Sequence, residues 1–104
     1  MSHLQKQDVI SALAALAQET RLDVFRALVK AGPEGRVPGA LAQSLGIPSA
    51  TLSFHLKELK NARLVTAERN GRSLVYRAAF QTMQDLIAYL GENCCQGQGC
   101  GPAC

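Results

Sequence analysis

Apolar residues recur at helical spacing along most of this 104-residue chain. We expect a first helix over about residues 7–18, because three apolar residues there share one face: Val9, Leu13 and Leu16. A second helix should follow, with Thr20 as its cap, since the hydroxyl can accept a hydrogen bond from the backbone amide of Asp23. The expected buried stripe of this second helix consists of Leu22, Phe25 and Val29.

Glycine and proline divide the next stretch into two shorter helices. Gly32-Pro33 should end the second helix, and Pro38 suits the first turn of a third, which Gly46 then stops. Leu41 and Leu45 should face inward from this third helix. Ser49 is the expected cap of a fourth helix. Its leucines fall within about 60° of one another at 100° per residue and should face the core: Leu52, Leu56 and Leu59.

A hairpin pattern follows the fourth helix. Leu64 to Arg69, then Asn70-Gly71, then Ser73 to Ala79 predict a two-residue hairpin of the Asn-Gly type. Met83, Leu86, Ile87 and Leu90 then repeat at i, i+3, i+4 and i+7 on a fifth helix that should stop near Gly91. The fold class is therefore mainly α with one β-hairpin, in the order α-α-α-α-β-β-α, which is the winged form of the helix-turn-helix.

Positive charge is concentrated in one part of the chain. The net charge is +3, but residues 49–77 hold six basic residues against two acidic ones, a net +4, while the rest carries −1. Such concentration is typical of a surface that binds a polyanion. No apolar run approaches the roughly 20 residues that a membrane span needs, and the start of the chain does not fit a signal peptide, so a cytoplasmic protein without a membrane partner is expected.

The outward side of the fourth helix and the hairpin tip are the candidate surface for double-stranded DNA. Phe54 is either an exposed apolar residue without a role or a contact to a thymine methyl group. His55 lies at the edge of the apolar arc, which favours a hydrogen-bonded structural role, although we include it in the candidate set. The set is Ser49, Ala50, Thr51, Ser53, Phe54, His55, Lys57, Lys60, Arg69, Asn70 and Arg72.

From Thr20 to Tyr76 the chain resembles the ArsR/SmtB family of bacterial metal-responsive repressors. Three motifs carry the resemblance: Glu19-Thr20-Arg21-Leu22, the run Ser49 to Leu59, and Asn70-Gly71-Arg72-Ser73-Leu74-Val75-Tyr76. The resemblance implies a homodimer built on the first and last helices, a two-fold operator, and release from DNA when an inducer binds. The candidate dimer interface is Leu13, Leu16, Met83, Leu86, Ile87 and Leu90.

The chain departs from this family at three places. Residues 34–40 contain none of the cysteines that many arsenic-responsive members carry at the start of the third helix, so that inducer site is absent. The last helix offers Asp85 and no histidine, which argues against the zinc site of other members. Many members have glycine after the recognition helix, where this chain has Arg63. If Arg63 is left-handed it costs about 1 kcal/mol, unless Asn61 or a shifted helix end absorbs the turn.

All four cysteines lie in the last eleven residues, Cys94, Cys95, Cys100 and Cys104. Thiolates select soft metals and metalloids, and three of them suit As(III) or Sb(III). Four would suit zinc, but the adjacent pair Cys94-Cys95 lacks the usual spacing of a structural zinc site. A redox-sensing pair and a thiol-rich end without a function are the alternatives.

These observations predict two parts and one function. Residues 1–92 should form the DNA-binding and dimerisation domain, and residues 93–104 a metalloid-binding tail. The predicted protein is a repressor that leaves its operator when As(III), Sb(III) or a methylated arsenite binds the tail thiols, with no organic cofactor. A thiol enzyme or a metal-delivery protein finds little support, because no histidine, aspartate or lysine stands beside the cysteines to activate them.

Overall fold

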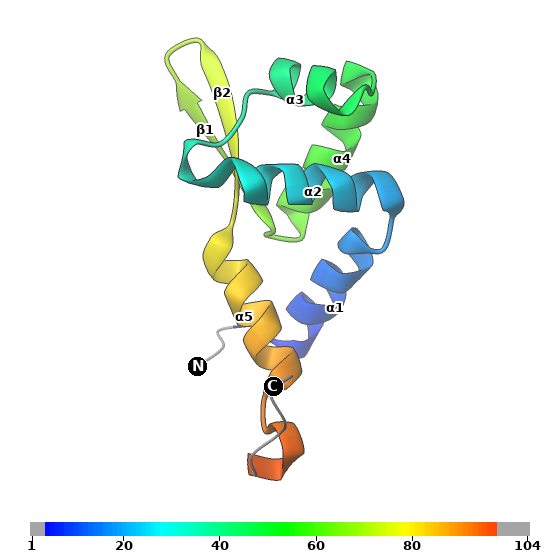
Figure 1. Ribbon diagram of the computed structural model, residues 1–104, viewed down its shortest axis with the longest axis vertical. Helices are drawn as coiled ribbons and strands as arrows, with labels where there is room; N and C mark the ends of the chain where they lie inside the picture. Colours follow the sequence, from blue (N-terminus) through cyan, green and yellow to red (C-terminus); the bar gives the residue numbers. More distant parts are fainter. Residues whose placement is uncertain (1–3, 98–104) are drawn as a thin grey trace.

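The computed structural model describes residues 4–97, which form α-helices and one β-hairpin at the edge of the molecule (Figure 1). The expected winged helix-turn-helix order is confirmed. The elements in chain order are α1 (Lys6–Leu16), α2 (Glu19–Ala31), α3 (Pro38–Leu45), α4 (Ser49–Asn61), β1 (Val65–Asn70), β2 (Ser73–Ala78) and α5 (Phe80–Gly91), with short 3₁₀ turns η1 (Gly32–Glu34) and η2 (Cys94–Gly97).

Two of the expected helix caps are wrong. The backbone of Gln18 is extended, and its side chain accepts a 2.7 Å hydrogen bond from the backbone amide of Arg21, so α2 begins before Thr20. The long glutamine side chain reaches the third amide of the helix, which leaves Thr20 inside the first turn. At α4, Pro48 is the extended residue before the helix, and Ser49 is the first helical residue without a capping bond.

The expected helix ends around α3 are confirmed. Pro38 occupies the first turn, where a missing backbone N–H costs nothing. Gly46 follows the last turn in the left-handed region, with φ 66°. Gly32 likewise stands after α2 with φ 73°. The helix-turn-helix therefore consists of α3, a turn at Gly46-Ile47-Pro48, and α4.

The core lies between α2, α3, α4 and the base of the hairpin. Leu52, Leu56 and Leu59 are buried, as expected for the inner side of α4. The stripes expected on the first two helices are partly wrong, because α1 turns Val9 and two alanines inward while Leu13 is exposed and Leu16 half-buried. Of the stripe expected on α2, Leu22 is exposed, Val29 is half-buried and Phe25 is buried. The largest fully buried side chains are Val24, Leu28, Leu41, Leu52, Leu56, Leu59 and Leu64.

The hairpin loop is shifted by one residue from its expected position. Asn70 pairs with Ser73, so the two loop residues are Gly71 and Arg72 rather than Asn70 and Gly71. Gly71 has φ 66°, and glycine at the first loop position is what one of the two favoured hairpin turns requires. The shift keeps Asn70 in the ladder and places Arg72 at the tip.

Arg63 takes the left-handed conformation, with φ 65°, in the connection from α4 to β1. Asn61 is still helical and Ala62 follows it, so neither absorbs the turn. The backbone amide of Arg63 donates to the carbonyl of Lys60, and that of Leu64 donates to the carbonyl of Leu59. Leu64 is fully buried, so its burial opposes the backbone cost of about 1 kcal/mol at Arg63.

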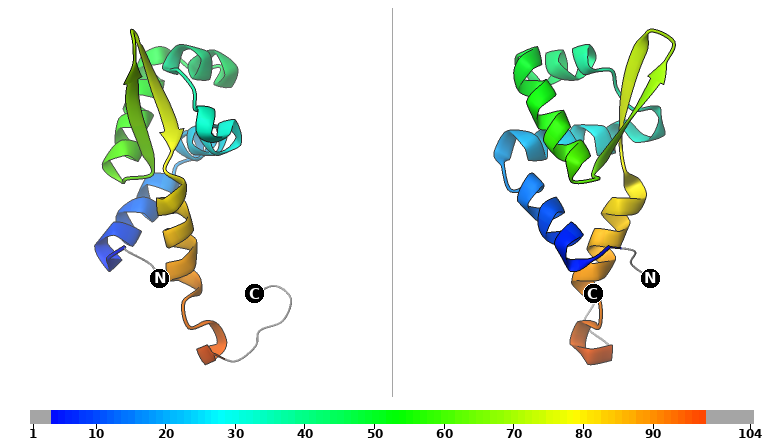
Figure 2. Two further views of the ribbon diagram at one scale, coloured as in Figure 1. Left: turned by 90° about the vertical axis from the view of Figure 1, so that its left-hand side faces the viewer. Right: turned by 180° about the vertical axis from the view of Figure 1, so that it is seen from behind.

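The molecule has two ends that contain different elements (Figure 2). The hairpin tip, α3 and the start of α4 lie at one end, and α1 and α5 lie at the other. On α5, Leu86 is buried in the core of its own chain, while Ile87 and Leu90 are 62% and 60% exposed. Met83 is half-buried.

Candidate DNA interface and thiol site

The outward side of α4 is polar and small except for one aromatic ring. Ala50, Ser53 and Lys57 are exposed, as is Phe54 with 54% of its surface accessible. Since the opposite side of the helix is buried in the core, these residues are the ones that α4 presents to solvent. Small and polar side chains of this kind suit a helix that reads a major groove.

His55 does not belong to this face, so its inclusion among the DNA contacts is wrong. Only 6% of its surface is accessible, and its Nδ1 accepts a 3.3 Å hydrogen bond from Nε of Arg21. The structural alternative is therefore the one that holds. Burial, followed by the nearby positive charge of Arg21, holds the pKa of His55 below its ordinary value of 6.5, so the neutral imidazole that can accept this bond is favoured.

Arg21 is the residue that sequence reasoning missed. Its Nη1 donates to the carbonyl oxygen of Ala15 at 3.2 Å, so one guanidinium joins the end of α1 to the recognition helix α4. The guanidinium carbon also lies 5.6 Å from the ring centroid of Phe54. Phe54 and His55 meet edge to face with their centroids 5.4 Å apart. The motif Glu19-Thr20-Arg21-Leu22 was the available signal.

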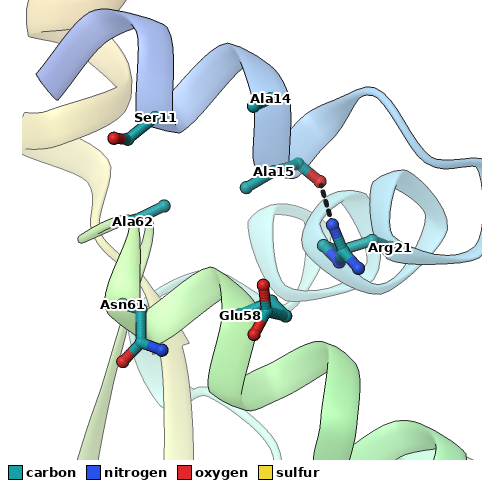
Figure 3. Close-up of a pocket in the computed structure, with 7 residues that line it drawn as sticks. All are labelled: Ser11, Ala14, Ala15, Arg21, Glu58, Asn61 and Ala62. Atoms are coloured by element: carbon teal, nitrogen blue, oxygen red, sulfur yellow. Dashed lines mark hydrogen bonds between the residues drawn. The ribbon is translucent and has the colours of Figure 1, made fainter. Parts of the chain in front are cut away.

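A space of about 300 Å³ lies beside Arg21, between α1 and α4 (Figure 3). Three alanines and Ser11 leave the two helices apart at this point. Figure 3 shows Glu58 and Asn61 on the α4 side, and the bond from Arg21 to Ala15 at the edge of the space. Beside this space, Arg21 adds a polar link between α1 and α4 to the buried contacts of Val9, Ala12 and Ala15.

The hairpin carries two exposed arginines at its tip. Arg69, Asn70 and Arg72 are exposed there, and Lys57 and Lys60 are exposed on α4. The guanidinium of Arg77 is used within the chain, because it donates to the carboxylate of Glu68 and to the carbonyl of Pro33, each at 2.7 Å. Figure 1 shows the hairpin tip and the start of α4 at the same end of the molecule, so one extended polyanion can contact both.

The first two tail cysteines follow α5 directly. Cys94 and Cys95 are exposed, and their sulfur atoms lie 3.6 Å apart. Asn93, Cys95 and Gln96 have positive φ, so the chain turns sharply here instead of continuing the helix. The hydrogen bond with Cys94, and to a smaller extent burial, raises the pKa of the Cys95 thiol.

Cys100 and Cys104 lie outside the described residues. Within residues 4–97, no three or more histidine, cysteine, aspartate or glutamate side chains gather into a group that could hold a metal ion. Asp85 is buried and accepts a 3.0 Å hydrogen bond from Nε2 of Gln81, so its carboxylate is used inside α5. Also within the described part of the chain, no helix has the length and apolar character to cross a membrane.

The recognition helix α4, the short helix α3 before it and a basic hairpin define a winged helix-turn-helix protein. A family model described as a helix-turn-helix domain matches residues 16–68. The HTH-type transcriptional repressor SmtB of Mycobacterium tuberculosis is 35% identical over 85 residues, which cover 78% of this chain and 61% of that protein. The chain therefore belongs to the helix-turn-helix family that this model describes, and it is similar to the repressor SmtB. It spans about three fifths of the length of its curated relatives.

Two solved structures have the same fold. An ArsR-like transcriptional regulator from Rhodococcus sp. RHA1 superposes with a TM-score of 0.73 at 27% identity, covering 81% of this chain and 76% of that one. The homodimeric winged helix-turn-helix DNA-binding domain of Mb0332 from Mycobacterium bovis gives a TM-score of 0.66 at 24% identity, covering 96% and 98% of the two chains. Both likenesses extend beyond the helix-turn-helix to the flanking helices.

Proposed function

We propose that this chain is a homodimeric repressor that binds a two-fold DNA operator and releases it when a trivalent metalloid binds its tail thiols. The observation that carries the DNA part is the common location of two surfaces at one end of the molecule: the outward side of α4 and the basic hairpin tip. A helix in the major groove with a hairpin beside it is how winged helices bind duplex DNA. The cytoplasm is the compartment in which such a regulator acts.

Arg72 at the hairpin tip provides the test of DNA binding. Replacing it by alanine should weaken binding to all sequences alike and reduce the slope of log affinity against log salt by about one, because one phosphate contact is lost. Lys6→Ala on α1 is the matched control and should leave the slope unchanged. Changes at Ser53 or Phe54 should instead alter which base pairs are preferred. An unchanged slope for Arg72→Ala removes that residue from the phosphate contacts.

The second copy is supported by the apolar side chains that α1 and α5 turn outward. Leu13 is 42% exposed, Ile10 49%, and Ile87 and Leu90 more than half. Exposed apolar side chains on adjacent helices are typical of a surface that another protein covers. The likeness in fold to a homodimeric winged helix-turn-helix domain supports a second copy of this chain as that partner.

The inducer part of the proposal depends on the tail. Two sulfurs that share one zinc-sized ion at bonds of about 2.3 Å lie about 3.8 Å apart in tetrahedral geometry. The 3.6 Å separation of the Cys94 and Cys95 sulfurs fits such a shared ion. As(III), Sb(III) or a methylated arsenite would take these two thiolates and a third from Cys100 or Cys104. Cys100 is favoured weakly, because the shorter loop costs a few tenths of a kcal/mol less to close.

The coupling between the two sites must be a difference in free energy between two dimer states, typically about 1 to 3 kcal/mol. Cys94 comes three residues after the end of α5, the proposed dimer helix. Ordering the tail at that point can change the angle between subunits and so the distance between the two copies of α4.

Serine variants and a promoter fragment test the inducer site. Cys94→Ser and Cys95→Ser proteins should bind the operator but stay bound in arsenite, Cys100→Ser should respond at higher doses, and Cys104→Ser should respond normally. An arsenic-edge absorption spectrum should count three sulfurs around the metalloid. Release of the Cys94→Ser, Cys95→Ser double variant by arsenite would place the sensor elsewhere.

A redox switch is the second candidate, and the close approach of the Cys94 and Cys95 sulfurs is the observation that favours it. A redox switch would release DNA in peroxide without any metalloid, and a reductant would restore binding. A sensor of zinc or another soft metal would instead respond to that metal in place of arsenite.

A further inference from the structure

A second pocket lies between α2 and α3, on a part of the surface that the DNA and thiol proposals do not use. Its volume is about 320 Å³. Asp23, Arg26 and Lys30 recur at helical spacing on the side of α2 that lies opposite the buried Val24 and Leu28. Ser44 of α3 closes another side, and Arg36 stands in the connection between the two helices.

The lining of this pocket has an unbalanced charge. Arg26, Lys30 and Arg36 contribute three positive charges, and Asp23 contributes one negative charge. Over residues 4–97, none of the three cations takes part in an ion pair, whereas Arg77 and Arg63 each lie near a carboxylate. Like charges around one space repel unless an anion occupies it, so the pocket favours a ligand with about two negative charges.

The backbone of Arg36 is fixed in place. Its amide and carbonyl pair with those of Tyr76 in β2 at 2.9 Å and 2.8 Å, which forms an isolated β-bridge to the hairpin. The preceding Gly35 has φ 71°, and a Cβ there would lie 2.5 Å from the carbonyl oxygen of Tyr76. Glycine therefore allows the close approach of the two backbones. This pairing joins one wall of the pocket, at Arg36, to strand β2 of the hairpin.

We propose that this pocket binds a phosphate group. Arg26 and Arg36 would supply planar guanidinium donors, Lys30 a point charge, and the hydroxyl of Ser44 a further donor. The phosphate can come from a free small molecule or from the backbone of bound DNA. In either case the bound phosphate would join α2, α3 and, through Arg36, strand β2. It would thereby stiffen the hairpin relative to the helix-turn-helix.

Inorganic phosphate is the first probe, titrated into the full chain and followed by backbone amide NMR, with sodium chloride at matched ionic strength as reference. We expect saturable shifts of amides around the pocket that chloride does not produce. Arg26→Gln and Lys30→Gln should each weaken phosphate binding about tenfold, as expected for loss of one charged hydrogen bond. Asp23→Asn should tighten it, because the only negative charge in the lining is removed. Lys6→Gln is the matched control.

DNA is the second probe and separates the two sources of phosphate. If free phosphate does not bind, but Lys30→Gln lowers the salt slope of DNA binding by about one while Lys6→Gln does not, the phosphate belongs to the DNA backbone. The proposal is overturned if chloride reproduces the phosphate shifts and Lys30→Gln also matches its control on DNA. Because the titration with inorganic phosphate contains no DNA, a failure of the repressor proposal would leave that result readable.

Discussion

The two ends of this molecule differ in how far a single chain buries their apolar side chains. At the end with α3, α4 and the hairpin, the outward residues are mostly polar and the leucines of α4 are buried. At the other end, α1 and α5 leave Ile10, Ile87 and Leu90 about half exposed or more. All seven of the largest fully buried side chains lie on α2, α3, α4 or the connection to β1.

This difference separates what one chain stabilises from what needs a partner. The helix-turn-helix end holds most of the buried side chains of the core, which keep α4 in a fixed orientation. The exposed apolar side chains of α1 and α5 gain burial only when something covers them, and the thiols Cys94 and Cys95 lie directly beyond α5. A regulator can use that arrangement, because a change at the α1–α5 end can alter how the helix-turn-helix end is held.

The largest expected effect is a difference in the free energy of unfolding between substitutions at the two ends. Leu59→Ala removes a fully buried side chain and should lower the free energy of unfolding by about 2 to 5 kcal/mol. Ile87→Ala should lower the stability of the isolated protomer by less than about 1 kcal/mol, because that side chain is 62% exposed. Urea denaturation over a series of protein concentrations measures both. Equal losses in the protomer would contradict the contrast between the ends.

The second effect concerns assembly. Leu86→Asp is unsuitable as a test of dimerisation, since Leu86 is buried in its own chain and the variant would damage the protomer. Changing Ile87 and Leu90 together to aspartate should give folded monomers, and operator affinity should fall about a hundredfold or more, because the two half-sites are no longer linked.

Sedimentation and circular dichroism check this prediction together. Gln84→Asp, an exposed polar position on the same helix, is the control and should remain dimeric. A double variant that sediments as an intact dimer would assign the interface to another surface.

The sequence predicts the helix-turn-helix end better than the α1–α5 end. Near α3 and α4 the signals are local: Pro38 and Gly46 bound a helix, and leucines at helical spacing identify its buried side. These predictions are confirmed because burial within the chain and helical spacing agree. On α1 the same spacing selects Leu13, which is exposed, because spacing cannot tell a face that meets the core from one that meets solvent or another chain.

The candidate site was predictable to a similar extent. The outward side of α4 and the tip of the hairpin follow from periodicity and charge. Arg21 was missed because its partners, Ala15 and His55, belong to two other helices, and only the packed structure brings them to one guanidinium. The loop position was missed by one residue because Asn70-Gly71 and Gly71-Arg72 both suit a two-residue turn, and strand register decides between them.

A smaller effect should appear in the pH dependence of the link between the ends. The pKa of His55 is lowered in the folded chain, so folding favours its neutral form. That stability is present in full above the unfolded pKa of about 6.5 and is lost as the pH falls through the lower folded value. His55→Asn retains an acceptor for Arg21 without a proton to gain. Thermal unfolding between pH 7.5 and 5 should therefore decline less for His55→Asn than for the unaltered chain, and parallel curves would contradict this.

The smallest effect lies at Arg63, where the two ends meet. Its backbone has φ 65°, and its guanidinium lies 3.8 Å from the carboxylate of Asp8 on α1. The arginine side chain is 72% exposed, so this ion pair contributes little. Arg63→Ala loses the pair and keeps the strain, whereas Arg63→Gly loses the pair and relieves the strain. The glycine variant should therefore be more stable than the alanine variant by about 1 kcal/mol, reduced somewhat by its greater freedom when unfolded. Chemical denaturation of the two variants measures this difference directly, and an alanine variant of equal or greater stability would show that the left-handed turn carries no strain.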